Sequence, residues 1–417
     1  MRILVNDYAG HPFQLQLSRE LARHGHTVLH TYFAAYPTPK GRTDVDSEAS
    51  GDLTIDPIAI GGNFRQHSAL SRRAADKAYG KAVCQRVKLF LPDVVISANT
   101  PLDAQKQMLE ATHAVGGSFV FWLQDVLSVA IEFVLRKKHF PLAGVVGRIY
   151  SRLERRLLQN SDAIVCIAPD FRGRLEDWGI ARNKTFVIEN WAPLDEITPL
   201  QRDTAWATAN DLVGKTRFMY SGTLGMKHRP ELLLELARRY EARHDVCVVV
   251  IAQGAGADWL REKAASIRPG VLQIFPFQPY ERHAEVLASA DILITLLDDD
   301  CGAFAVPSKT LAYMCAGRSL LVAAPADNLI SKIIERAAAG ESTSATAEAF
   351  LAGAERLLMD SQYRSICGIN ARAYATQTFC IDKIYERFMH TFAFALLEKD
   401  PVCEDVRTKP ISSPGTS

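Results

Sequence analysis

Short apolar runs alternate with helix-like segments along most of the chain. In the first half, runs rich in Val, Ile, Leu and Phe occupy residues 2–6, 27–33, 93–99, 118–124 and 162–168. A segment with apolar positions at helical spacing follows the first run at residues 14–25 and ends on Gly25. Strands that are apolar throughout are buried on both faces, and their alternation with helices indicates βαβ units around a parallel sheet.

The second half repeats this pattern after an interruption. Residues 189–215 contain two prolines and show no clear periodicity, which predicts a linker. Apolar runs then return at residues 217–222, 246–254, 271–277, 291–297 and 319–325. Two successive α/β sets predict two Rossmann-like domains, and we expect them to face each other across a cleft.

The pattern also predicts boundaries along the chain. We expect an N-terminal Rossmann-like domain, a linker, a C-terminal Rossmann-like domain, a C-terminal helix that can pack back on the N-terminal domain, and a disordered tail. These correspond to residues 1–190, 191–215, 216–375, 376–398 and 399–417.

Composition narrows the class of protein. Hydrophobic residues make up 48% and charged residues 23%, which excludes a mainly disordered, collagen-like or coiled-coil chain. A net charge of +1 argues against nucleic acid as the main partner. The eight cysteines form no CxxC pair and no zinc-spaced cluster with His, which is typical of a reducing cytosol. Neither the N-terminus nor residues 119–135 has the pattern of a signal peptide or a membrane span, so we expect a cytoplasmic protein.

Ligands of open parallel sheets bind beyond the carboxyl ends of the strands. Four loops of the second half follow strands in this way. Some contain small residues that let a phosphate approach the backbone, one is a rigid apolar loop that suits a flat base, and two contain lysines that can pair with a phosphate. The predicted donor-side residues in these loops are Gly222, Thr223, Lys227, Gln253, Gly254, Phe277, Gln278, Ser308 and Lys309.

The last loop carries the sharpest signal. Ser308 is a candidate N-cap of a helix that closes at Gly317, and a helix N-terminus beside Lys309 suits a diphosphate. Alternatively, Pro307 and Ser308 merely start a helix and Lys309 is solvated. The convergence of four loops favours the ligand. A GxGxxG fingerprint is absent, which counts against a nicotinamide or flavin enzyme.

The segment VPSKTLAYMCAGRSLLVA (306–323) resembles the signature of family-four glycosyltransferases with the GT-B fold. It is most similar to a bacterial branch that builds surface polysaccharides and includes N-acetylfucosamine transferases. MRIL, SDAIVCIAPDF, YSGTLGMK and FPFQPYERHAEVLASADILITLL resemble other parts of the family in the same order. The resemblance covers about residues 1–395.

This resemblance implies transfer of a sugar from a nucleotide-sugar to a saccharide or lipid-linked saccharide, with the donor held by the C-terminal domain. Lys227 and Lys309 would neutralise the diphosphate, helped by N–H groups at Gly222-Thr223 and Ser308. The loop at Phe277-Gln278 would take the base. The family usually retains anomeric configuration and needs no metal or other cofactor.

One departure concerns two family glutamates, which contact a sugar hydroxyl and the nucleotide ribose. Their places hold Phe304 and Ala312 here, and Ser319 stands where proline is usual. Asp298, Asp299, Asp300 or Glu335 could take over these contacts, and the sequence does not choose among them.

The first half offers acceptor-side candidates. Asp125 ends a strand and, if buried, could polarise an acceptor hydroxyl; alternatively it caps the next helix. Gly10 and His11 either contact the acceptor or belong to a solvated loop. Residues 133–158 interleave basic and apolar side chains, which suits the inner face of an anionic membrane, although such a stretch can also be a solvated helix face.

Three other hypotheses remain open. A metal-dependent transferase could use Asp298-Asp299-Asp300 as a DxD site, although two α/β halves do not match that architecture. The missing glutamates leave room for a non-catalytic nucleotide-sugar-binding subunit. A sugar-nucleotide epimerase shares the fold.

Overall fold

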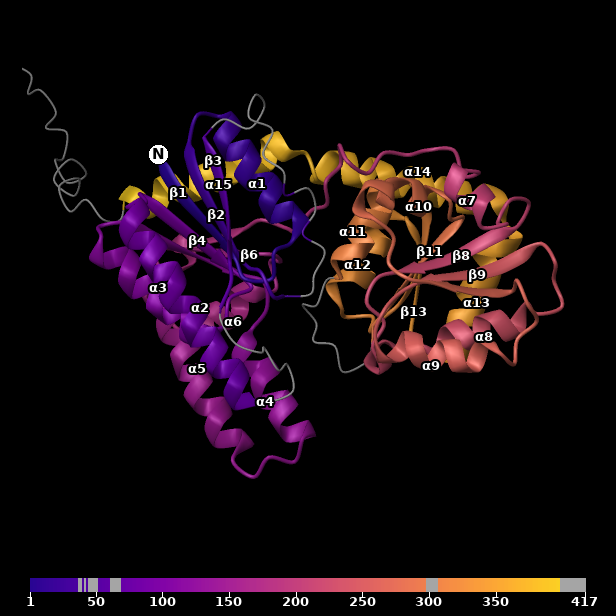
Figure 1. Cartoon of the computed structure of the whole chain (residues 1–417), viewed down its shortest axis with the longest axis horizontal. Helices are drawn as coiled ribbons and strands as arrows, with labels where there is room; N and C mark the ends of the chain where they lie inside the picture. Colours follow the sequence, from indigo (N-terminus) through magenta and orange to yellow (C-terminus); the bar gives the residue numbers. More distant parts are fainter. Residues whose placement is uncertain (37–39, 41–42, 44–51, 61–68, 298–306, 398–417) are drawn as a thin grey trace, which may run out of the picture. The chain divides into compact units, whose positions relative to one another are not determined.

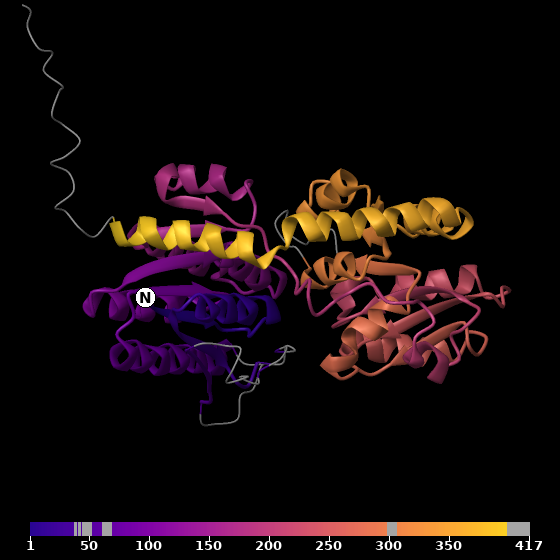
Figure 2. The ribbon, with the colours of Figure 1, turned by 90° about the horizontal axis from the view of Figure 1, so that it is seen from above.

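The computed structural model describes residues 1–36, 40, 43, 52–60, 69–297 and 307–397. The chain forms two compact units, which Figures 1 and 2 show from two directions. Unit 1 holds most of residues 1–188 together with the chain from Tyr385 onward, and unit 2 holds Glu189–Ile384. Each unit is built around its own parallel sheet, so the predicted fold class of two α/β domains is confirmed.

Unit 1 contains a seven-stranded parallel sheet in the order β3-β2-β1-β4-β5-β6-β7. The strands are β1 (Arg2–Asp7), β2 (Thr27–Phe33), β3 (Leu53–Ile58), β4 (Val94–Ala98), β5 (Ser118–Leu123), β6 (Ala163–Cys166) and β7 (Thr185–Val187). Every residue of β4, β5 and β6 is buried, as their continuous apolar runs predict.

Helices follow most strands of unit 1. They are α1 (Pro12–Arg23), α2 (Ala69–Phe90), α3 (Leu102–Ala114), α4 (Leu127–Lys137), α5 (Ala143–Asn160), α6 (Phe171–Asp177) and the short η1 (Arg182–Lys184). The last helix, α15 (Ile381–Leu397), returns to this unit from Tyr385 onward, and Figure 2 shows it running along the sheet. There the ring of Phe388 lies 4.9 Å from that of Trp122, and Ser118 Oγ donates to the carbonyl of Ala395 (2.9 Å).

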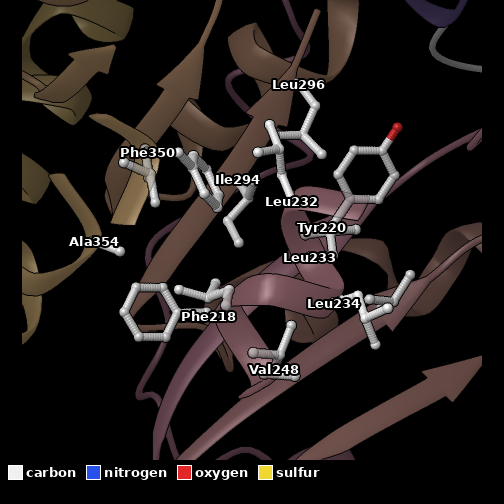
Figure 3. Packing of buried hydrophobic residues seen from close by; sticks show 14 of the residues in the cluster. Phe218, Tyr220, Leu232, Leu233, Leu234, Val248, Ile294, Leu296, Phe350 and Ala354 are labelled. Atoms are coloured by element: carbon white, nitrogen blue, oxygen red, sulfur yellow. The ribbon is translucent and has the colours of Figure 1, made fainter. Parts of the chain in front are cut away.

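Unit 2 contains a six-stranded parallel sheet in the order β10-β9-β8-β11-β12-β13. The strands are β8 (Thr216–Ser221), β9 (Val246–Ile251), β10 (Leu272–Phe275), β11 (Ile292–Leu296), β12 (Ser319–Ala323) and β13 (Gly340–Thr343). Its core is shown in Figure 3, where Phe218, Val248 and Ile294 from neighbouring strands pack with Leu233 and Phe350 from the covering helices.

Helices also follow most strands of unit 2 along the chain. They are α7 (Ala205–Ala209), η2 (Met226–His228), α8 (Glu231–Arg239), α9 (Ala255–Ala264), η3 (Tyr280–Arg282), α10 (His283–Ala288), α11 (Ser308–Cys315), α12 (Leu329–Ala337), α13 (Ala347–Met359) and α14 (Ser361–Thr378). Because α14 continues to Thr378, the final helix begins at Ile381 and not near residue 376 as predicted.

The predicted linker is part of unit 2. Within residues 191–215, Trp191 and Trp206 are each 1% exposed, and Arg202 pairs with Asp291 of the domain body (2.7 Å). Two buried tryptophans are anchors that a free linker lacks, and they outweigh the prolines that made the segment read as a connection. The predicted disordered tail lies outside the described residues. In the ranges the structure describes, no helix combines the length and apolarity that crossing a membrane requires.

Candidate functional site

Four strands of unit 2 end at one edge of its sheet. They are β8, β9, β10 and β11, which are consecutive neighbours in the order β10-β9-β8-β11 and all parallel. Their carboxyl ends therefore lie at the same edge. The loops after β8, β9 and β10 belong to the described residues, whereas residues 298–306, which follow β11, do not. The predicted donor-side residues all fall in these loops or in the first turn of α11, except Lys227, which lies one step further in η2.

Lys309 is the central cation of this edge. It is half-buried in the first turn of α11, its Nζ donates to the Tyr220 hydroxyl (2.6 Å), and Nζ lies 3.9 Å from the centroid of the Tyr220 ring. None of the carboxylates in the described ranges forms an ion pair with it. Burial without a compensating charge lowers the pKa of Lys309 to about 7. An anion at this position would restore the charged form.

Gly222 makes room for that lysine. Its φ is +139°, and a Cβ built there would lie 2.8 Å from Lys309 Nζ, so a larger residue would displace the cation. One part of the sequence prediction needs correction. The N–H of Gly222 donates to the carbonyl of Ile251 (2.9 Å), which continues the strand pairing and occupies the group expected to bind phosphate. Thr223 is exposed, and its carbonyl accepts from the Tyr220 hydroxyl (2.8 Å).

Helix α11 is fixed to the sheet by side-chain hydrogen bonds. The Tyr313 hydroxyl accepts from the N–H of Ser221 (2.9 Å) and donates to its carbonyl (2.7 Å), while Thr310 bonds Thr295 of β11 (2.9 Å). The Tyr313 contact holds α11 against the carboxyl end of β8, and the Thr310 contact holds its first turn, which carries Lys309, against β11.

Ser308 is the first helical residue and not the N-cap that the sequence predicted. Pro307 occupies the cap position with φ −64° and ψ 117°, and no side chain accepts from the first turn. The N–H of Thr310 donates to the carbonyl of Pro307 (2.9 Å), so the N–H groups of Ser308 and Lys309 are the ones that we expect to meet a ligand anion.

Gly254 serves the packing of one loop on another. Its φ is +115°, and a Cβ there would lie 2.8 Å from the carbonyl oxygen of Leu224; a Cβ at Gly256 would lie 2.9 Å from that oxygen too. The N–H of Leu224 donates to the carbonyl of Gln253 (2.9 Å). The loops after β8 and β9 are therefore locked together, while the Gln253 side chain is exposed.

The predicted base loop is held by the segment that the sequence presented as a linker. Gln278 Oε1 accepts from Trp206 Nε1 (3.1 Å), and Gln278 Nε2 donates to the carbonyl of Pro276 (2.9 Å). Phe277 is half-buried. The amide of Gln278 thus orients the loop. Of the two predicted base contacts, Phe277 is therefore the one that we expect to stack on the nucleotide base. Trp206 was missed, although a tryptophan in a Pro-containing polar stretch was its signal.

Lys227 differs from Lys309 in its surroundings. It is exposed in η2, directly after the β8 loop, where the N–H of Gly225 donates to His228 Nδ1 (3.0 Å). Its charge is available at the rim of the site without the desolvation that Lys309 undergoes.

On unit 1, Gly10 and His11 belong to a turn organised by Asp7. Asp7 ends β1 and is fully buried; its carboxylate accepts from the N–H groups of Ala9 (3.2 Å) and His11. Gly10 has φ +72° and donates to the carbonyl of Asp7 (3.0 Å). His11 is half-buried, and its ring stacks on that of Phe13 with centroids 5.8 Å apart. Burial raises the pKa of Asp7.

Two amides complete this cluster, which sequence reasoning missed. Asn99 follows the neighbouring strand β4, has φ +53°, and its Nδ2 lies 3.4 Å from Asp7 Oδ1. With its amide oxygen turned toward Asn99, Gln14 of α1 donates to both carboxylate oxygens of Asp7 (2.9 and 2.8 Å). The signal was a charged residue at the end of an otherwise apolar strand.

Asp125 is exposed, so the burial on which its role in polarising an acceptor hydroxyl was conditional is not present. Its Oδ1 accepts from the N–H of Val126 (2.8 Å), and partial desolvation of the carboxyl still raises the pKa of Asp125. It does not cap α4. The buried Glu154 of α5 does so, accepting from the N–H groups of Leu127 (2.9 Å) and Ser128 (3.0 Å). Asp125 therefore remains a polar group at the carboxyl end of β5.

The places of the two family glutamates are only partly described. Asp298, Asp299, Asp300 and Phe304 lie outside the described residues. Ala312 is buried in α11, Glu335 is exposed on α12, and Ser319 donates to the carbonyl of Asp291 (3.0 Å).

Comparisons with known proteins fit this arrangement. Residues 10–191 match the family model of the glycosyl transferase 4-like domain, which is less than half of the chain. The chain is 23% identical over 254 residues to WcaI of Escherichia coli K12, named as a colanic acid biosynthesis glycosyl transferase, and 24% identical over 251 residues to WbjE of Pseudomonas aeruginosa, named as a glycosyltransferase. These alignments take in 59% and 60% of this chain, and the chain spans about three fifths of each relative (61%).

A solved structure matches nearly the whole chain. The crystal structure of Anabaena HepE in complex with UDP and glucose superposes with a TM-score of 0.68 over 94% of this chain and 99% of that one, at 15% identity. The fold is that of GT-B glycosyltransferases.

Proposed function

We propose that this chain is a GT-B glycosyltransferase that moves a sugar from a nucleotide-sugar to a saccharide or lipid-linked saccharide acceptor in surface polysaccharide biosynthesis. The observation that carries the proposal is Lys309, a half-buried cation without a carboxylate partner among the described residues, at the edge where the parallel strands of a Rossmann-like unit end. The match of residues 10–191 to a glycosyltransferase domain and the relatives named as glycosyltransferases support it.

Unit 2 binds the donor in this proposal. The Lys309 ammonium and the first-turn amides of α11 hold the diphosphate, and the exposed Lys227 adds charge from the rim. Phe277 stacks on the base, and Gln253 and Thr223 supply polar contacts. These groups lie on the leaving-group side of the reaction, where they stabilise the negative charge that develops on the diphosphate as the glycosidic bond breaks.

Unit 1 binds the acceptor. His11, on a turn fixed by Asp7, and Asp125 are its polar candidates. Asp125 is proposed to orient the acceptor hydroxyl, and transfer proceeds with retention of anomeric configuration. Ala312 is apolar, so it offers no base for attack from the far face. Cations in place of a metal neutralise the diphosphate, and no metal or further cofactor takes part.

The narrower features of the proposal follow from the sequence resemblance and the basic stretch in unit 1. The enzyme belongs to the surface-polysaccharide branch that includes N-acetylfucosamine transferases, and it works in the cytoplasm at the inner face of the membrane. Relatives named as glycosyltransferases favour transfer over the alternatives of a non-catalytic subunit or an epimerase.

The direct experiment screens the purified chain for thermal stabilisation by UDP-, GDP- and ADP-sugars and then measures product with the best donor. A ligand that binds only the native state raises stability by about 2.7 kcal/mol at a hundredfold excess over Kd. We expect stabilisation by one nucleotide class, a glycosylated product, and transfer that survives EDTA. Binding without product would favour the non-catalytic subunit, and transfer restored by Mn²⁺ after chelation would favour the DxD alternative. The anomeric configuration of the product follows from NMR.

A further inference from the structure

Exposed apolar side chains concentrate on one hairpin of unit 1. The described residues include seventeen large hydrophobic side chains that are exposed, and seven of them lie between residues 129 and 149. We call these seven the hairpin patch: Val129, Phe133 and Val134 of α4, Phe140 and Leu142 of the turn, and Val145 and Ile149 of α5. Each of these seven residues is between 43% and 56% exposed to solvent. A patch of this density marks an interaction surface.

The hairpin that carries the patch is a well-anchored element. Helix α4 packs against α5, and Figure 1 shows the pair extending from the sheet of unit 1 with their connecting turn at the far end. Glu154 of α5 caps the N-terminus of α4, and the Tyr150 hydroxyl donates to Asp103 of α3 (2.9 Å). The buried Ala143 and Leu157 of α5 face the protein. The patch is therefore the outer surface of a folded hairpin and not a loose segment.

The net charge of the hairpin indicates what kind of surface the patch contacts. Residues 127–160 contain seven Lys and Arg but only two Glu, a net +5 in a chain whose net charge is +1. Neither glutamate is available to neutralise the other basic residues of the hairpin. Glu132 is bound by Arg136 (2.6 Å), and Glu154 is buried at the α4 cap. The exposed charges beside the apolar side chains are thus almost all positive.

The basic and apolar side chains share one surface. On α5, Val145, Ile149, Arg152 and Arg156 recur at helical spacing, so apolar residues near the turn pass into basic residues further along. Lys138 and Arg148 flank the turn and are exposed. This pattern is typical of interfacial membrane binding. Apolar side chains enter the boundary between headgroups and acyl chains, and the cations beside them contact lipid phosphates.

We infer that the hairpin patch docks on an anionic lipid bilayer. Phe140, Leu142 and the neighbouring apolar residues enter the interface, and the cations around them contact lipid phosphates. The inference deepens the proposed function and rests on it for its purpose, because a lipid-linked acceptor lies at that same surface. A protein partner with an acidic, apolar-centred surface and a second copy of this chain are outcomes that the test separates.

The test is co-sedimentation of the full chain with vesicles of phosphatidylcholine alone and of phosphatidylcholine mixed with phosphatidylglycerol. One variant reverses charge (Lys138→Glu with Arg152→Glu) and a second removes apolar surface (Phe140→Ser with Ile149→Ser). Matched controls make the same exchanges on exposed residues elsewhere: Lys81→Glu with Lys263→Glu, and Leu89→Ser with Ile369→Ser.

We expect the wild type to bind the anionic vesicles and to release them at high salt. Each basic residue near such a surface contributes about fivefold in binding, so the charge variant should bind more than tenfold more weakly. The apolar variant should bind at least fivefold more weakly, and both controls should match the wild type. Equal binding to both vesicle types, or equal losses in the controls, would overturn the inference. So would an apolar variant that binds vesicles normally but sediments as a smaller oligomer than the wild type, since a second copy would then cover the patch.

The same variants keep this outcome distinct from the proposed function. Stabilisation by the nucleotide-sugar and transfer to a water-soluble acceptor should be unchanged in both hairpin variants. If the wild type binds anionic vesicles through the patch but shows neither stabilisation nor transfer, the proposed function fails and the lipid contact stands. If transfer is normal and vesicle binding is absent, the reverse holds.

Discussion

Unit 2 leaves a half-buried cation without a carboxylate partner in its described part, whereas unit 1 surrounds a buried carboxylate with hydrogen-bond donors. Among the described residues Lys309 contacts the hydroxyl and ring of Tyr220, and burial lowers its pKa to about 7. Asp7 accepts from backbone N–H groups and from side-chain amides on two further elements. In the proposed function an anion from outside completes the first arrangement, whereas the hydrogen bonds of Asp7 already complete the second.

This difference assigns different roles to two strand-end sites of similar topology. The satisfied carboxylate of Asp7 fixes a turn, so it positions His11 and does not need a ligand. The buried cation of unit 2 costs stability in the empty protein, and the proposed function predicts that a bound diphosphate offsets this cost. Substitutions at the two sites should therefore affect different quantities: ligand affinity in unit 2 and folding stability in unit 1.

The largest effect is expected from Lys309→Met. Loss of a charge-assisted contact to phosphate costs about 1.5–3 kcal/mol, which lowers affinity for the donor about tenfold to a hundredfold. The empty variant should melt at a higher temperature than the wild type, because it no longer buries an uncompensated ammonium. Isothermal titration and a melting curve measure both quantities, with Lys263→Met on the exposed face of α9 as the control. Unchanged donor affinity would move the diphosphate site elsewhere.

The pH dependence of the same lysine comes next. In the folded, empty protein the pKa of Lys309 is about 7, below its ordinary 10.5, so the folded state binds fewer protons than the unfolded state between these values. Stability should therefore rise with pH across that window. Donor affinity should fall by up to about tenfold per pH unit above pH 7, because the diphosphate binds the protonated form.

Calorimetry in buffers of different ionisation enthalpy checks this directly, since binding at pH 8 should take up a proton. Lys309→Arg stays charged at these pH values and should bind the donor with little dependence on pH. Proton uptake of the same size in Lys309→Arg and in wild type would assign the titration to another group.

Asp7→Asn should have a smaller effect than Lys309→Met, and its effect should be on folding stability. The amide cannot accept from all the donors that surround the carboxylate, so we expect unit 1 to lose about 1–3 kcal/mol of stability. Donor affinity should not change. Urea unfolding and donor titration test the contrast, and Asp52→Asn on the exposed approach to β3 serves as control. A matching loss of donor affinity would mean that the two sites are coupled.

Much of this architecture could be predicted from the sequence. The features that the sequence did not predict depend on contacts between different helices, strands and loops. Continuous apolar runs such as β4 and β5 identify buried parallel strands, because burial on both faces leaves no alternation. VPSK predicted the position of Lys309 but not its partner, since Tyr220 lies on β8 and reads as one more apolar strand residue. The N–H of Gly222 was assigned to phosphate because pairing with Ile251 depends on strand register. Trp206, Glu154 and Asn99 act through contacts distant in sequence, and Gln14 reaches Asp7 from the helix that follows its strand.

The smallest effect concerns Gln278, and it decides how the base loop works. Its amide accepts from Trp206 Nε1 and donates within the loop, so we assign it to holding the loop and not to recognising the base. Gln278→Ala leaves the indole N–H unsatisfied and should cost about 0.5–1.5 kcal/mol of stability, with less than a threefold change in donor affinity.

Trp206→Phe breaks the same hydrogen bond from the other side and separates the two roles. If Gln278 only holds the loop, both variants should weaken UDP-, GDP- and ADP-sugar binding in the same proportion, because a displaced Phe277 loses stacking on any base. If the amide recognises the base, Gln278→Ala should change the order of preference among the three donors while Trp206→Phe leaves that order intact. Titrations of both variants with the three donors distinguish the cases, since stacking is tolerant of base identity and hydrogen bonding is not.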